Sequence, residues 1–150
     1  MHEFEQLEDA VVTALTPLLT ALTVRTLEPY SGQLDIDEVE AITRRFPCVY
    51  VIAPSLEHTP RNRYGDYAVP VTLIVGDRNL RGVKAAARGD AGSAGVYSLL
   101  ESIRNNLHNR RIHADWSPFV LRRESQLAWA PELSICLYQA EYETKTVKAG

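Results

Sequence analysis

The sequence has few of the side chains that most often form cross-links, hold metals or act as nucleophiles. Its 150 residues include two cysteines, one methionine and four histidines. Cys48 and Cys136 both lie in apolar stretches typical of strands, so we expect two buried free thiols and no disulfide. No two histidines have the i, i+4 spacing that lets one helix face hold a metal. His108, His113 and Asp115 come nearest to a cluster, and we expect them on the surface.

Long apolar runs and a basic leader are also missing. The longest strongly apolar run, around residues 49–53, is far shorter than the ~20 residues that span a bilayer. The first residues, MHEFEQLED, are acidic where a signal peptide would be basic. We therefore expect no membrane partner and no secretion. A chain of 150 residues with 45% apolar composition can bury one core, so we expect a single domain over residues 1–150.

Recognisable catalytic and cofactor motifs are absent as well. There is no G-x-S-x-G serine elbow, and neither cysteine has a histidine at a spacing that suggests a catalytic pair. Gly89, Gly92 and Gly95 lead into a helical pattern, yet their spacing fits neither the dinucleotide fingerprint nor the phosphate loop. A flexible hinge is the simpler interpretation of these glycines. We expect no catalytic, cofactor-binding or metal-binding residues, and a protein that is not an enzyme.

Charge is unevenly distributed along the chain, although the net charge is only −3. Residues 1–40 carry nine acidic and one basic side chain, whereas residues 41–130 carry thirteen basic and seven acidic ones. Such a division can steer the acidic face of one copy toward the basic face of another, as in a head-to-tail ring. The alternative is that each set only solvates its own surface. Overall acidity argues against a general nucleic-acid binder.

Hydrophobic periodicity indicates helices and strands in mixed order. Helices are expected near residues 4–22, 36–46 and 96–109. The first should have a kink or a break near Thr16, because Pro17 cannot donate a backbone hydrogen bond, with Thr16 capping a last short turn. Strands are expected at 24–28, 49–52, 69–76, 119–121 and 133–146, the second covered on both faces. The order predicts an α+β domain with a mainly antiparallel or mixed sheet of about four or five strands and helices packed on one face.

Two long segments show neither pattern and are expected to be flexible loops, at about 54–67 and 77–95. Loops of this length in compact domains are usually binding loops, lids or disordered linkers, and we expect the one at 77–95 to meet a partner. The second holds Arg78, Arg81, Lys84 and Arg88 among alanines and glycines, without the aromatic residues on which nucleic-acid bases stack. A protein contact is therefore favoured. The alternative is that the arginines only keep an unstructured loop in solution.

Several blocks of sequence, in this order and spacing, resemble a known family. They are RTLEPYSGQLD at 25–35, RRFPCVYV at 44–51, RNLRG at 78–82 and GDAGSAGVYSLLESIRNNL at 89–107, followed by the strand at 135–146. Together they resemble the small tail proteins of Mu-like phages and prophages, a family regarded as tail terminators or tail-completion proteins. The resemblance covers most of the chain, and none of its blocks is a catalytic signature.

The resemblance implies a tail-terminator-like fold and a structural role in the virion tail or neck, with assembly in the cytoplasm of the bacterial host. Such a protein caps the head-proximal end of the tail tube, stops its polymerisation and presents a surface for head-to-tail joining. The implied partners are further copies in a ring of about six subunits, the tail-tube protein and a head-tail connector protein. DNA would only pass through the lumen.

The expected contact residues follow from the basic loops and the resemblance together. Contacts to a neighbouring subunit or the tube are assigned to Arg78, Asn79, Arg81 and Gly82, with Lys84 and Arg88 toward the lumen and Arg61 and Arg63 on the other loop. Two alternatives stay open: a head-side connector of the adaptor or stopper type, and a small DNA-binding domain that uses the same arginines.

Overall fold

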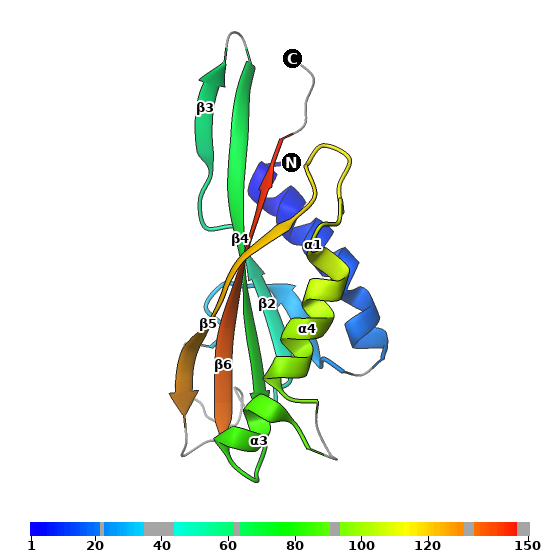
Figure 1. Cartoon of the computed structure of the whole chain (residues 1–150), viewed down its shortest axis with the longest axis vertical. Helices are drawn as coiled ribbons and strands as arrows, with labels where there is room; N and C mark the ends of the chain where they lie inside the picture. Colours follow the sequence, from blue (N-terminus) through cyan, green and yellow to red (C-terminus); the bar gives the residue numbers. More distant parts are fainter. Residues whose placement is uncertain (22, 35–43, 62–63, 91–93, 131–133, 147–150) are drawn as a thin grey trace.

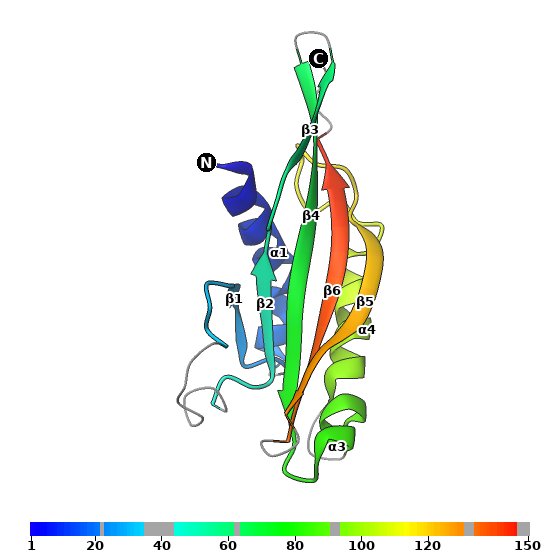
Figure 2. The same ribbon diagram turned by 90° about the vertical axis from the view of Figure 1, so that its left-hand side faces the viewer.

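A six-stranded sheet with helices on one face forms the body of the molecule (Figures 1 and 2). The computed structural model describes residues 1–21, 23–34, 44–61, 64–90, 94–130 and 134–146. Its elements, in order, are α1 (Glu3–Thr20), β1 (Thr26–Pro29), β2 (Cys48–Ile52), β3 (Glu57–Arg61), β4 (Tyr64–Arg78), α3 (Val83–Arg88), α4 (Val96–Leu107), β5 (Val120–Ala130) and β6 (Ile135–Lys145).

The sheet is mixed and open, which confirms the predicted α+β class. The strand order is β1-β2-β4-β6-β5, and β3 pairs with β4 beside this path. Among the strands that the structure describes, β1 and β2 run parallel and the other pairs are antiparallel. The helical segment expected just before Pro47 falls largely on 35–43, outside the described residues.

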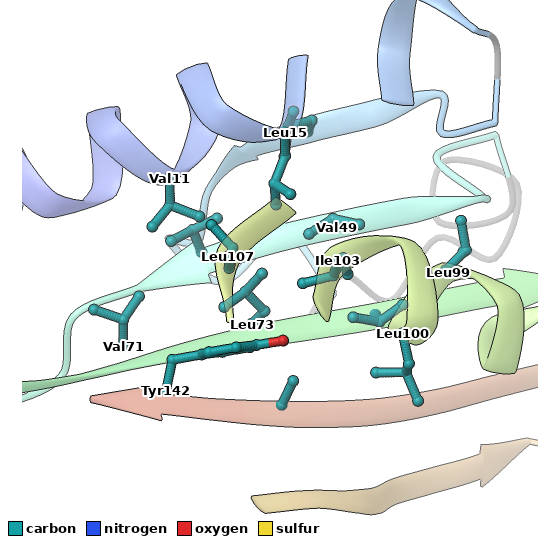
Figure 3. Close-up of a cluster of buried hydrophobic side chains, with 14 of the residues drawn as sticks. Val11, Leu15, Val49, Val71, Leu73, Leu99, Leu100, Ile103, Leu107 and Tyr142 are labelled. Carbon is teal, nitrogen blue, oxygen red and sulfur yellow. The ribbon is translucent and has the colours of Figure 1, made fainter. Parts of the chain in front are cut away.

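One large core joins α1 and α4 to the same face of the sheet (Figure 3). The three- and four-residue spacing of α1 places Leu7, Val11 and Leu15 against the sheet, each fully buried. From α4, Ile103 and Leu107 fill the space between α1 and the strands. Full burial of an aliphatic side chain contributes roughly 1.5–3 kcal/mol, so these contacts are what hold both helices on the sheet.

Strand β2 is buried on both sides, as its uninterrupted apolar sequence predicts. Val49 and Val51 belong to the main core under the helices. Cys48 and Tyr50 point to the other face and pack with Phe46 in a smaller cluster. Both cysteines of the chain are buried and free, which confirms that prediction.

Of the kink or break predicted near Thr16, the break is wrong. Helix α1 continues through Pro17 to Thr20, although Pro17 donates no backbone hydrogen bond. The Thr16 hydroxyl does not cap a new turn; it donates to the Val12 carbonyl at 2.9 Å. Leu18 is buried in the core beyond the proline. Pro17 removes one backbone hydrogen bond of the helix, and the burial of Leu18 keeps the turn that follows it in place.

The first predicted loop is instead a hairpin. Residues 57–61 and 64–68 pair as antiparallel strands β3 and β4, with His58 opposite Tyr67 and their rings 4.9 Å apart. Pro60 is compatible with this because β3 has a free edge, where no ladder hydrogen bond is required of it. The hairpin supplies the sixth strand and extends past the rest of the sheet at the end opposite α3 (Figure 2).

The second predicted loop is interrupted by a short helix. Helix α3 has the sequence VKAAAR, in which alanine, lysine and arginine all have high helix propensity. Ala86 and Ala87 are buried in the main core, so α3 is attached to the body of the molecule. Strand β5 is also longer than the expected 119–121, because its middle section of charged residues pairs with β6 despite its polarity.

Candidate subunit interface

The basic segment expected to make contacts forms one end of the molecule, where β4 passes into α3 (Figure 1). Leu80 is 82% exposed at the turn between them. The Arg81 side chain is 75% exposed, and Lys84 and Arg88 are exposed on α3. We call these four residues, Leu80, Arg81, Lys84 and Arg88, the basic tip. It combines one apolar side chain with three cations.

A buried carboxylate ties both ends of this segment together. Asp77 is 1% exposed at the end of β4. Its Oδ1 accepts a hydrogen bond from the Arg78 N–H at 2.7 Å, and its Oδ2 accepts one from the Gly95 N–H at 3.2 Å. Gly95 is the residue that precedes the first turn of α4. Asp77 therefore links the strand that leads into the basic tip to the helix that follows it.

Asn79 stabilises the turn between β4 and α3 through hydrogen bonds of its backbone and its side chain. Its backbone N–H donates to the Ser134 carbonyl at 3.1 Å, and its side-chain amide donates to Asp90 at 2.9 Å. Its side-chain oxygen accepts the Arg81 N–H at 2.9 Å. The Arg81 guanidinium lies 3.6 Å from the same Asp90 carboxylate. Asn79 thus orients the turn, while Arg81 keeps most of its surface open to a partner.

Glycine is required where the segment returns to α4. Gly95 has φ of +82°, and a Cβ on it would lie 2.3 Å from the backbone nitrogen of Gly89. Gly82, just before α3, has φ of +119° but no neighbour within 4 Å of such a Cβ. Gly95 therefore allows two chain segments to approach closely, and Gly82 allows the backbone to adopt the positive φ of the turn. Gly92 lies outside the described residues.

The remaining predicted contact residues lie elsewhere. Arg61 ends strand β3 in the projecting hairpin, at the end of the molecule opposite α3 (Figure 1). Arg63 lies outside the described residues. The structure therefore groups Arg78, Asn79, Arg81, Gly82, Lys84 and Arg88 at one end and does not bring Arg61 to them. The sequence pattern does not identify Asp77 and Asp90 as residues of this site. Their signal in the sequence is that each carboxylate is close along the chain to the basic residues.

A hollow of about 370 Å³ opens beside α4, above β5 and β6. Its apolar lining includes Tyr97, Leu100 and Tyr138. The two tyrosine rings meet edge to face with centroids 5.6 Å apart and hydroxyl oxygens 3.3 Å apart. The hydrogen bond to Tyr97 raises the pKa of Tyr138 to about 12, so the Tyr138 phenol is neutral in ordinary buffers. We call this site the tyrosine hollow.

Charged residues line the rest of the tyrosine hollow. The Arg104 Nε donates to Glu124 Oε2 at 2.8 Å, and a second guanidinium nitrogen bonds the other carboxylate oxygen. This two-point pair raises the pKa of Arg104 above its usual value. Glu101, also in the lining, is exposed and makes no ion pair with any residue that the structure describes.

A second hollow, of about 500 Å³, lies between the β3–β4 hairpin and β6. It is lined by Glu57, Thr59, Asp66, Tyr67, Ala68, Glu143, Lys145 and Thr146. The described residues that line the two hollows include no His or Cys. Within the described ranges no three of the His, Cys, Asp and Glu side chains gather as metal ligands, and no helix is long and apolar enough to cross a membrane.

The described residues thus form an open α+β sheet with an exposed basic end and surface hollows beside α4 and beside the β3–β4 hairpin. The profile of the family described as Bacteriophage Mu, Gp37 matches residues 3–145, and the chain belongs to this family. It is therefore a structural protein of a Mu-like phage and a component of the virion, which confirms the family expected from the sequence. No curated protein matches the chain.

Proposed function

We propose that this phage structural protein is a tail terminator: it forms a ring on the head-proximal end of the tail tube, stops the tube from growing and offers a joining surface to the head connector. Membership of the Mu-like family supports a virion role. The basic tip supports the proposal further, because its exposed side chains stand on a turn that internal hydrogen bonds hold in place.

The physical argument concerns how the basic tip is held. Interfaces are strongest where the contacting groups are ordered before binding, since little conformational entropy is then lost. Asp77 and Asn79 supply that order through bonds to both flanking segments. The tip presents Leu80 at 82% exposure with cations beside it. An apolar centre with a charged rim is the usual composition of a protein contact.

A terminator must also differ from the subunits it stops. A tube grows when each ring repeats the surface that it covers, and growth ends when a ring presents a different one. The two ends of this molecule differ greatly: the basic tip closes one end and the β3–β4 hairpin projects from the other (Figure 2). A ring of such subunits would present unlike faces to the tube and to the head connector.

The proposal is tested by measuring mass and shape with the tail-tube protein. The purified chain is studied by light scattering alone and after mixing with polymerising tube protein, followed by negative-stain imaging. We expect rings of about six subunits, or tubes capped at one end. A chain that stays monomeric and leaves the tubes uncapped would refute a terminator. Salt-sensitive binding of DNA by that monomer would favour the DNA-binding alternative.

A further inference from the structure

Leu80 projects from the basic tip without filling any site in its own molecule. It is 82% exposed. The turn that carries it is closed by a hydrogen bond from the Gly82 N–H to the Asn79 carbonyl at 2.9 Å. Asn79 is itself bonded to Ser134 and Asp90. Leu80 is thus a fixed apolar projection, and its exposure shows that the tyrosine hollow of the same molecule does not receive it.

The tyrosine hollow is the apolar counterpart on the same chain. Tyr97 is 44% exposed and meets Tyr138 at its edge, while Leu100 forms part of the lining. Aromatic side chains at the centre of an interface contribute large contact area with little loss of rotamer entropy. The volume of about 370 Å³ leaves room for a leucine side chain between the two rings and α4.

The charges at the two sites are opposite once internal pairs are set aside. In the hollow, Glu124 is neutralised by Arg104, which leaves Glu101 as an exposed carboxylate. On the basic tip, Lys84 and Arg88 are exposed and make no ion pair within the described part of the chain. Each site therefore carries charge that a second copy could match.

We propose that the basic tip of one subunit docks in the tyrosine hollow of the next, with Leu80 against Tyr97 and Tyr138 and with Arg88 beside Glu101. This inference rests on the proposed function, since it names the subunit contact of the terminator ring. A contact between two different patches is heterologous, and it closes into a ring when the rotation between subunits allows. Lys84 and Arg88 then face a neighbouring subunit and not the lumen.

Charge reversal tests the contact directly. Glu101→Lys and Arg88→Glu are made singly and together in the full chain, and association is measured by light scattering with and without tube protein. Each single variant should weaken association by roughly tenfold or more, because like charges then face one another. The double variant should recover most of that loss. Arg111→Glu, an exposed arginine outside both sites, is the matched control and should associate as the unmodified chain does.

The outcomes separate this contact from the function on which it rests. All substituted side chains are exposed, so the melting temperature of each variant should stay within a degree or two of the parent. Weaker association of both single variants, with association recovered in the double variant, supports the contact. Rings and capped tubes that form equally well in every variant overturn the contact and leave the terminator intact. If the unmodified chain neither associates nor caps tubes, both proposals fail.

Discussion

Removing the Asp77 carboxylate should destabilise the protein far more than its position at a strand end suggests. The Asp77→Ala variant leaves two N–H groups, those of Arg78 and Gly95, without their acceptors at a site where Asp77 is 1% exposed. Hydrogen bonds to a charged group contribute about 1.5–3 kcal/mol each. Part of this is offset because a buried carboxylate no longer has to be desolvated. We therefore expect a loss of roughly 3–5 kcal/mol in the free energy of unfolding.

The assay is denaturant unfolding, supported by thermal melts. A domain of this size loses about 2–4 °C in melting temperature per kcal/mol, so the expected drop is on the order of 10 °C. The stability of Asp77→Asn should lie between that of Asp77→Ala and that of the parent. In the parent each carboxylate oxygen accepts a hydrogen bond from a different N–H group, whereas the asparagine side chain has only one oxygen. Asp115→Ala, at an exposed carboxylate, is the control and should change stability by less than about 0.5 kcal/mol. A loss below about 1 kcal/mol in Asp77→Ala would refute the role assigned to this carboxylate.

Three further predictions concern other parts of the fold. Gly95→Ala should lower stability by about 2 kcal/mol or more, measured by denaturant unfolding, because φ is +82° and the new Cβ would lie 2.3 Å from a backbone nitrogen. Burial raises the pKa of Cys48 to about 12 and of Cys136 to about 11, above the unfolded value of 9.0. The stability due to these neutral thiols is complete below pH 9 and declines as pH rises toward 11 and 12, so melts should show a loss only above pH 9. Trp116→Phe should cost about 1–3 kcal/mol, because the buried indole N–H donates a 2.8 Å hydrogen bond to an α1 side chain; an unchanged unfolding midpoint would contradict this.

The parts of the fold with strong periodicity could be predicted from sequence. Helix α4 and the alternation of β6 were visible because each face of these elements meets one environment only, core or solvent. Cys136, Ala140 and Tyr142, at alternate positions of β6, belong to the core under the helices, and Tyr138 packs against that core. Strand β2 could also be predicted, since burial on both faces favours apolar residues along the whole strand.

The elements that were missed are those whose residues meet solvent on most sides. Strand β3 includes a proline and charged residues, so its pairing with β4 depends on a hairpin partner that local sequence does not reveal. Helix α3 is only one and a half turns long and is held by two buried alanines, which gives too little periodicity to detect. Both elements fall in segments that the sequence predicts as loops.

The sequence predicts where most residues of the candidate interface lie, but not the contacts that hold them in place. The density of basic residues marked the segment around Arg81, and the structure gathers most of those residues at one end. The supporting carboxylates of Asp77 and Asp90 act through contacts across the fold, to Gly95 and to Asn79. The tyrosine hollow joins Tyr97 to Tyr138 across 41 positions of sequence, a pairing that only the packing of α4 on the sheet creates.

The most direct test of the terminator proposal is the length of tails assembled without this chain. The reading frame is deleted from the phage genome that encodes it, and particles in the lysate are imaged by electron microscopy with a complemented strain as the control. We predict tail tubes of uncontrolled length that are not joined to heads. Tails of normal length joined to heads would contradict the proposal, and tails of normal length left unjoined would favour the head-side connector instead.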